Sequence, residues 1–165
     1  MARETDTDRI AFGGGCHWCT EAVFQQLRGV EHVDQGWASA TDAPARYSEA
    51  VVVTFRPREI PLAALIQVHL HTHSCTSPHP MRGKYRSAVY GFGESQMAEA
   101  RSVIAAAQAD FERPIITEVV RFSGFRQNTS RYQDYYLRNP GAPFCERYIS
   151  PKLEALRRRF AERVR

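Results

Sequence analysis

The sequence predicts an α+β fold: a ferredoxin-like β-α-β-β-α-β core, followed by additional C-terminal helices and an irregular tail. Three patterns lead to this prediction. A glycine run separates a short apolar strand from a helix near the N-terminus, a continuous β-branched run at 49–55 is typical of a buried strand, and two later helical stripes alternate with strands. The chain has 165 residues, enough for a single domain, 1–165, that buries its own core.

The elements of the first half follow from hydrophobic spacing and from glycine and proline breaks. Alternating or β-branched apolar runs indicate strands, and apolar residues three and four apart indicate helices. In order, these patterns predict a frayed segment at 1–8, a strand at 9–13, a helix from Cys16 to about 28, a strand at 30–38, a loop at 39–46 and a strand at 49–55.

The second half follows by the same criteria. Ser95 is expected to cap the longest helix, because a serine side chain can accept a hydrogen bond from a free backbone N–H. In order, the predicted elements are a helix at 62–71, a loop at 73–84, a strand at 85–92, a helix at 95–111, a strand at 115–122, a helix at 132–137, a mobile irregular segment at 139–150 and a terminal helix at 151–163.

The composition is ordinary for a globular protein, with 43% apolar and 24% charged residues. The net charge of +4 and the isoelectric point near 9.0 are mild, and the basic residues of the last helix are better explained as a solvated face than as a nucleic-acid site. Four cysteines, without a signal peptide or a membrane-length apolar run, favour a reducing cytoplasm. We therefore expect a cytoplasmic monomer with no nucleic-acid or membrane partner.

Cys16 is the candidate nucleophile, because it stands where the glycines end and a helix begins. Unpaired backbone N–H groups and the positive end of the helix dipole favour a thiolate there, and the thiolate is the reactive form of cysteine. A small buried cysteine is one alternative, and a zinc half-site or redox pair made with Cys19 is another. A phosphate loop is excluded, since no Lys-Ser/Thr follows the glycines.

The same stretch resembles a known signature. Residues 15–18 (Gly-Cys-His-Trp), Glu21 and residues 24–30 (Phe-x-x-Leu-x-Gly-Val) resemble the pattern of A-type peptide methionine sulfoxide reductases, in which Gly-Cys-Phe-Trp-Gly precedes a Glu and Phe-x-x-Leu-x-Gly-Val. The resemblance spans about residues 9–156 and implies an α+β fold of the kind predicted above. It implies an enzyme that reduces methionine-S-sulfoxide, protein-bound or free, to methionine.

The resemblance also implies the residues that act with Cys16. Glu49 matches the catalytic acid of the family, and a carboxylic acid between apolar walls can stay protonated, although a solvated carboxylate at a strand end is the simpler interpretation of this position alone. Tyr85 would donate a phenolic hydrogen bond to the sulfoxide oxygen, with a packing aromatic as the alternative. Tyr47 is a candidate second phenol, but the family has a longer insertion before its acid.

Two residues beside the nucleophile are candidate walls of a methyl-binding pocket. The indole of Trp18 suits contact with a methyl group or a sulfur, and packing in the core is an equally good interpretation. His17 replaces the phenylalanine of the family and makes that wall more polar.

Two further cysteines could resolve the oxidised nucleophile. Cys145, which follows Asn-Pro-Gly-Ala-Pro-Phe, resembles the tail cysteine that does so in the family. Cys19 replaces a glycine of the family and forms a Cys-x-x-Cys pair that can close into a disulfide. Cys75 is expected to be a packing residue. The aspartate of the family loop is missing from residues 77–84, where His79 or solvent would take its hydrogen bonds.

The implied cycle needs no bound cofactor and no metal. The Cys16 sulfenic acid condenses with the resolving thiol, and thioredoxin or a similar external dithiol reduces the resulting disulfide. The alternative function is a zinc-binding or thiol–disulfide exchange protein, with ligands drawn from the three cysteines Cys16, Cys19 and Cys75 and from the histidines at 69, 71 and 73. Alternate residues of a helix face different directions, however, so those histidines cannot all converge.

Overall fold

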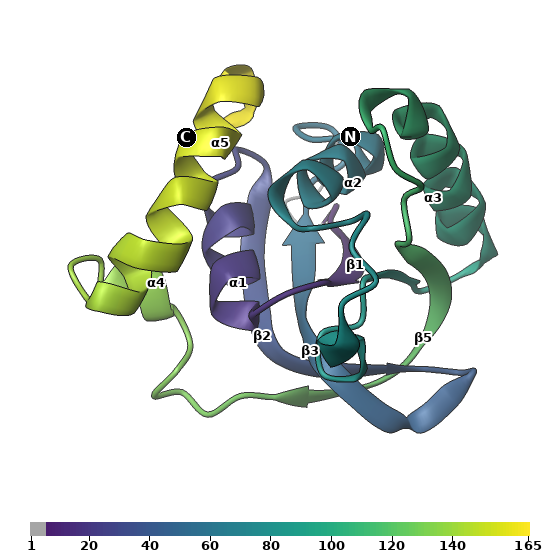
Figure 1. Ribbon diagram of the computed structural model, residues 1–165, viewed down its shortest axis with the longest axis horizontal. Coiled ribbons are helices and arrows are strands. Elements are labelled where there is room, and N and C mark those ends of the chain that lie inside the picture. The colour runs from purple at the N-terminus through teal and green to yellow at the C-terminus, as the bar shows by residue number, and fades with distance from the viewer. Residues whose placement is uncertain (1–5) are drawn as a thin grey trace.

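The computed structural model, which describes residues 6–165, is built around a barrel of five strands with helices packed against its outside (Figure 1). The strands are β1 (Asp8–Gly13), β2 (Val30–Ala40), β3 (Ala43–Phe55), β4 (Ala88–Gly91) and β5 (Glu118–Gln127). The α-helices are α1 (His17–Gln25), α2 (Leu62–Thr72), α3 (Glu94–Ala107), α4 (Tyr135–Arg138) and α5 (Ser150–Arg159). Shorter helical turns are η1 (Pro80–Gly83), η2 (Gln108–Asp110), η3 (Cys145–Ile149) and η4 (Ala161–Arg163).

The pairing of the strands closes the sheet on itself. β1 lies between β3 and β4 and is antiparallel to both, while β2 pairs antiparallel with β3 and with β5. β5 then runs parallel to β4, and this last pairing completes the barrel. The predicted mixture of helices and strands is confirmed. The closure by β5 is a feature that the predicted core did not contain.

The two faces of each strand enter different cores. Val51 and Val53 of β3 belong to the main core beneath the helices, whereas Ala50 and Val52 belong to a smaller cluster on the opposite face. Side chains alternate between the faces of a strand, so the predicted burial of this strand is confirmed, and it holds on both faces. Glu49 precedes Val51 by two residues and therefore faces the helices as well.

Residues 39–46 form a hairpin, so the predicted loop is wrong. Ala40 pairs with Ala43, which leaves only two residues to turn between β2 and β3. Arg86 braces this turn with bonds of 2.7 and 3.1 Å to the carboxylate of Asp42. Short polar residues have weak strand propensity, and here the backbone ladder and the ion pair outweigh it.

Several predicted boundaries also differ: β5 spans Glu118–Gln127 and not 115–122, and α4 spans Tyr135–Arg138 and not 132–137. Tyr85 lies on a bend before β4 and not in the strand, and α3 starts after Gly93, so Ser95 does not cap it. β1 begins at Asp8, one residue inside the segment predicted to fray, and residues 1–5 of that segment lie outside the described residues.

The chain from 139 to 150 is more regular than predicted. The π-helix η3 runs directly into α5, and the side chain of Cys145 at its start has no exposed surface. The preceding segment is tied to α1, because the buried carboxylate of Glu21 accepts the backbone N–H groups of Asp134 and Tyr135 at 2.9 and 3.1 Å. The mobility predicted for 139–150 stays a prediction.

Within residues 6–165, no helix has both the length and the apolar composition that crossing a membrane requires.

Candidate active site

Cys16 lies at the N-terminus of α1, as predicted. It is the N-cap residue, and its carbonyl accepts the backbone N–H of Thr20 at 3.2 Å. The glycine loop before it presses against α2: Gly14 has a φ of +153°, and a Cβ at this position would lie 2.4 Å from the His73 ring. Only glycine tolerates that conformation and that close approach, so the loop delivers the cysteine to the helix start.

Hydrogen bonds around the Cys16 sulfur favour its ionised form. The Cys19 thiol donates to this sulfur, as do the backbone N–H groups of Trp18 and Cys19, and together these bonds lower the pKa of Cys16 although burial opposes them. The same thiol hydrogen bond, together with burial, raises the pKa of Cys19. Cys16 is thus the sulfur of the pair that ionises more readily, and Cys19 is its hydrogen-bond donor.

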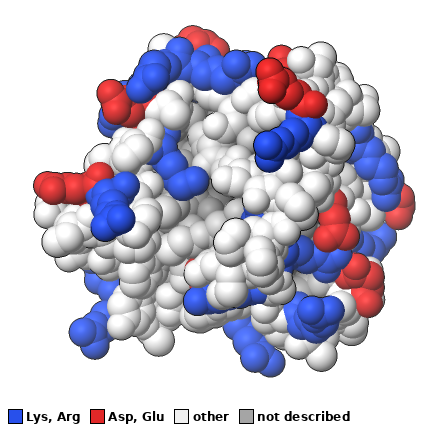
Figure 2. Space-filling model, in the orientation of Figure 1, with Lys and Arg blue, Asp and Glu red and all other residues white. Residues whose placement is uncertain are grey.

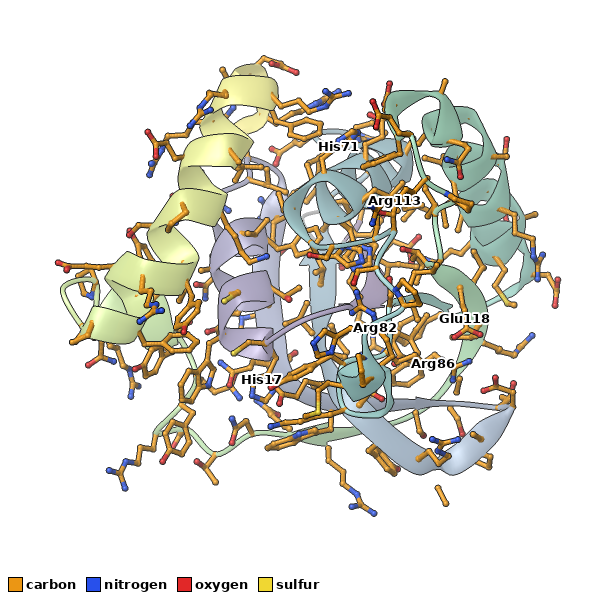
Figure 3. All side chains as sticks on the ribbon, in the orientation of Figure 1. His17, His71, Arg82, Arg86, Arg113 and Glu118 are labelled. Carbon is orange, nitrogen blue, oxygen red and sulfur yellow. The ribbon has the colours of Figure 1, made fainter. Side chains whose placement is uncertain are left out.

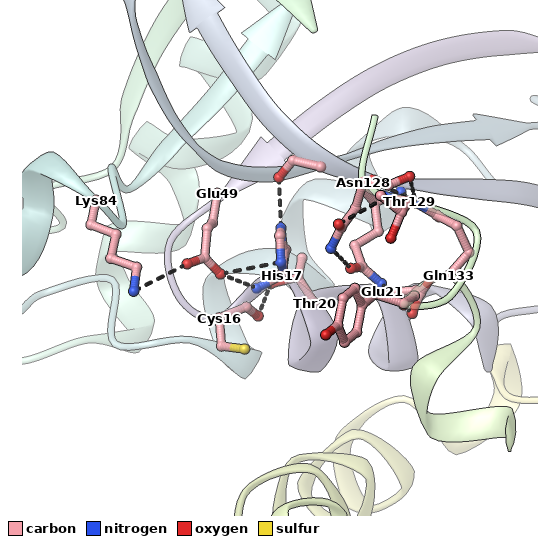
Figure 4. Close-up of polar contacts among 12 residues, drawn as sticks. Cys16, His17, Thr20, Glu21, Glu49, Lys84, Asn128, Thr129 and Gln133 are labelled. Carbon is pink, nitrogen blue, oxygen red and sulfur yellow. Dashed lines mark hydrogen bonds and ion pairs between the residues drawn. The ribbon is translucent and has the colours of Figure 1, made fainter. Parts of the chain in front are cut away.

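The carboxyl of Glu49 lies at the same helix end (Figure 4). Its Oε1 accepts the backbone N–H of His17 at 3.1 Å, and the residue is only 7% exposed. Its Oε2 lies 3.6 Å from the ammonium group of Lys84. The positive end of α1 therefore lies beside both the Cys16 sulfur and the Glu49 carboxyl group.

A cavity of about 380 Å³ opens beside Cys16, a volume typical of sites for small molecules. The face seen in Figure 2 is hollowed near its centre, and uncharged atoms dominate the hollow while lysines and arginines lie around it. Aromatic rings and two cations contribute to the cavity wall. Its lining includes Gly15, Cys16, Cys19, Met81, Arg82, Tyr85, Phe144, Tyr148 and Lys152.

A second cavity, of about 320 Å³, lies around Arg86. Its guanidinium is already held by the carboxylates of Asp42 and Glu118, and Figure 3 shows Arg86 beside Glu118. No cysteine lines this cavity. The cavity beside Cys16 is therefore the candidate active site.

Comparisons with known proteins agree with this geometry. The chain matches the family described as "Peptide methionine sulfoxide reductase" over residues 8–164. The peptide methionine sulfoxide reductase MsrA of Ralstonia nicotianae is 36% identical to it over an alignment that covers 99% of each chain. The chain belongs to the peptide methionine sulfoxide reductase family. Membership makes it an oxidoreductase, and its reaction is the thiol-dependent reduction of methionine sulfoxide.

Solved structures agree on the fold of this reductase. The crystal structure of reduced Mxr1 from Saccharomyces cerevisiae matches with a TM-score of 0.76 at 18% identity, covering 88% of this chain and 92% of that one. The structure of Mxr1 in complex with Trx2 matches with a TM-score of 0.63, also at 18% identity, covering 82% of this chain and 88% of that one.

The three predicted substrate-binding residues, His17, Trp18 and Tyr47, do not line the cavity of the reductase. The ring of Trp18 stacks on Tyr135 at 4.1 Å, so the C-terminal segment covers the indole. Tyr47 faces the same side of β3 as Glu49 but lies further along the hairpin, with the Arg126 guanidinium 4.1 Å above its ring. Tyr85 does line the cavity.

The four cysteines of the reductase are free thiols in different environments. Cys16 is half-buried and Cys19 is buried beside it, and both line the cavity. Cys145 is fully buried, and burial raises the pKa of its thiol. Cys75 is buried and does not line the cavity, in keeping with a packing role.

The zinc-binding alternative gains no support from the part of the chain that the structure describes. Within residues 6–165, no group of three or more His, Cys, Asp or Glu side chains could hold a metal ion. His69 and His73 stack at 4.1 Å, whereas His71 lies 3.3 Å from Asp110. Figure 3 shows His71 well away from His17 and the start of α1. The histidines therefore do not converge with the cysteines.

Sequence reasoning missed the contribution of the C-terminal helices to the cavity. Lys152 lines it with its Nζ bonded to the Thr72 carbonyl at 2.7 Å, and burial lowers the pKa of this amine. Tyr148 lines the same wall. A signal was present, because Cys145, Tyr148 and Lys152 follow the spacing of one helical face. Because residues 139–150 were predicted to be irregular, this helical spacing was not recognised.

Proposed function

We propose that this reductase uses Cys16 as the nucleophile on methionine-S-sulfoxide bound in the adjoining cavity. The thiolate attacks the substrate sulfur and forms a sulfur–sulfur bond, and the sulfoxide oxygen then moves to Cys16 as that bond and the original S–O bond break. A proton reaches that oxygen, methionine is released, and Cys16 becomes a sulfenic acid. The methionine sulfur gains the two electrons that the cysteine sulfur loses.

The observation that carries this proposal is the pairing of Cys16 with Glu49 at one helix end. The sulfur opens onto the cavity and receives hydrogen bonds that favour the thiolate, while a largely buried carboxyl is anchored on the next backbone N–H. The polarised S–O bond of a sulfoxide needs a nucleophile at sulfur and a proton at oxygen, and this arrangement can supply both. We assign Glu49 as the proton donor.

Tyr85 is proposed to hold the sulfoxide oxygen with its phenol. It lines the cavity next to Lys84, whose ammonium lies 5.1 Å from the centre of its ring and also pairs with Glu49. The Lys84 ammonium therefore faces the carboxyl group from which the proton is proposed to leave. The methyl-binding role predicted for Trp18 would require the covering segment to move.

The decisive experiment is turnover of each sulfoxide epimer with dithiothreitol as the reductant. We expect reduction of the S epimer of a methyl sulfoxide and none of the R epimer, because sulfoxide reductases of this kind act on one epimer each. The assay follows formation of the sulfide by chromatography. Activity on the R epimer alone, or on neither, would overturn the proposed substrate.

Cys145 is proposed to resolve the sulfenic acid: its sulfur bonds to the Cys16 sulfur, and the hydroxyl leaves as water. Its burial means that η3 must open before the two sulfurs can meet. Cys19 is the alternative, since its thiol already contacts the nucleophile. A thioredoxin-like dithiol then reduces the disulfide. The solved complex of Mxr1, a protein of similar fold, with Trx2 supports this proposal.

Replacing Cys145 with serine is expected to leave one round of reduction per enzyme and to stall recycling by thioredoxin. The sulfenic acid still forms in this variant, but no tail thiol converts it to the disulfide that thioredoxin attacks. Sulfide release is measured once without reductant and then with thioredoxin, its reductase and NADPH. Cys19→Ser is the matched control and should recycle; if instead only Cys19→Ser stalls, Cys19 is the resolving residue.

Further expectations about the protein stay proposals. We propose a cytoplasmic monomer that acts without a bound cofactor and without nucleic-acid or membrane partners; four free thiols are consistent with a reducing compartment. We also propose that β1 to β4 with α1 and α2 follow the ferredoxin-like plan. The strand order β4-β1-β3-β2 within the barrel supports this assignment.

A further inference from the structure

The amine of Lys152 reaches the cavity of the nucleophile from another element. Lys152 lies in the first turn of α5 and lines the cavity together with Cys16. The same two residues also line a smaller recess that α1, α2 and α5 enclose. Negative charge on Cys16 and Cys19 raises the pKa of the amine, so these sulfurs and the ammonium group lie within electrostatic range of one another.

The ammonium group of Lys152 has donors to spare and no carboxylate partner in the part of the chain that the structure describes. It carries three N–H donors, and its hydrogen bond of 2.7 Å goes to the neutral carbonyl of Thr72. Burial lowers the pKa of the amine, because the charged form has lost part of its hydration, and no described aspartate or glutamate offsets that loss. A carboxylate that entered the cavity would replace the lost hydration with an opposite charge.

The opposite wall of the cavity has the same sign of charge. Arg82 also lines the cavity, and Figure 3 shows it on the other side of the first turn of α1 from α5. Its guanidinium donates at 2.6–3.0 Å to neutral backbone carbonyl oxygens, those of Gly14, Ser74, Ser77 and Tyr85. Of the residues described, no aspartate or glutamate lines this cavity. The wall therefore favours a ligand that is negatively charged, and it has no group to pair with a substrate cation.

We propose that Lys152 binds the α-carboxylate of the substrate, so that the preferred substrate is a methionine sulfoxide at the C-terminus of a polypeptide. This inference rests on the proposed function. A short chain of carbon atoms joins the sulfur and the carboxylate of this residue, so one small cavity can hold the sulfur at Cys16 and the carboxylate at Lys152. A charge-assisted hydrogen bond at that end fixes the orientation of the sulfoxide. The free amino acid is a poorer substrate, because its ammonium group would meet the charges of Lys152 and Arg82.

The test compares N-acetyl-methionine-S-sulfoxide with its primary amide, which has nearly the same shape and no negative charge. With the full-length enzyme and dithiothreitol, kcat/KM for the acid is expected to exceed that for the amide by about tenfold, mainly through KM. Free methionine-S-sulfoxide should be used less well than the acetylated acid. In Lys152→Met the advantage of the acid over the amide should disappear, whereas Lys152→Arg should keep it. Equal kcat/KM values for the acid and the amide in the original enzyme would overturn the inference without any variant.

Arg157→Met is the matched control, because it removes one positive charge from an exposed position of the same helix, outside the cavity lining. The preference for the acid should persist in this control, and an equal fall there would assign it to net charge and overturn the inference.

The ratio of the two substrates is measured on one protein, so changes in the reactivity of Cys16 or in the folded fraction cancel. If Lys152→Met loses activity on both substrates and keeps their ratio, Lys152 serves the nucleophile or the fold, and the inference fails. If Lys152→Met does not fold, Lys152→Gln, which keeps a donor for the Thr72 carbonyl, takes its place. If the original enzyme reduces neither substrate, the proposed function itself fails.

Discussion

Replacing Cys16 with serine is expected to abolish sulfoxide reduction, with a loss on the order of 10⁴-fold or more. A serine hydroxyl is not ionised at neutral pH and cannot form the sulfenic acid, so neither the first turnover nor recycling can proceed. Folding should be preserved, because the side chain is only half-buried and the substitution changes a single atom. Sulfide formation with dithiothreitol measures the loss, and circular dichroism verifies the fold.

Cys75→Ser is the matched control for this variant. Its side chain is buried but lies outside the cavity lining, so turnover should stay close to that of the original enzyme. Sulfide production by Cys16→Ser at more than a trace level would contradict the assignment of the nucleophile. Equal losses in both variants would indicate a general effect of removing a thiol.

Replacing Glu49 with glutamine should lower the rate of the first turnover by about 10² to 10⁴-fold, the range for loss of a general acid. The amide has nearly the same shape, and its oxygen can still accept the His17 backbone N–H, but it has no proton of suitable acidity to give. Rapid-quench measurement of sulfide formation separates this step from recycling. The loss should persist in the presence of excess thioredoxin.

Glu118→Gln provides the comparison for a carboxylate that takes no part in the reaction. This residue is exposed, pairs with Arg86 and lines the other cavity. A single-turnover rate near that of the original enzyme is expected. Should Glu49→Gln keep its full rate, the proton must come from another donor, and Tyr85 would be the next residue to replace.

The local part of the site was predictable from sequence, because it is encoded within one short segment. Three glycines followed by an amphipathic helix place Cys16 at a helix N-terminus whatever the remainder of the chain does. The face of the sheet on which Glu49 lies could be predicted for a similar reason, since side chains alternate between the two faces along β3.

The remainder depends on contacts between distant segments. Lys152 reaches the Cys16 cavity only because α5 packs beside α1 and α2, and no periodicity along the chain encodes that docking. The indole of Trp18 could line a pocket, but in the structure it stacks on Tyr135, which is more than a hundred residues away in the sequence. The turn at Asp42 likewise depends on Arg86, which lies just before β4.

The closed barrel has a consequence for how a polypeptide substrate is recognised. Each strand from β1 to β5 is bonded to two others, so none of them presents a whole free edge to which an incoming chain could add. Addition as an extra strand would force the substrate polypeptide to be extended and to pair with the sheet in a fixed register. Without it, a polypeptide substrate has to be held by side chains such as those that line the cavity beside Cys16, and no backbone register is imposed on it.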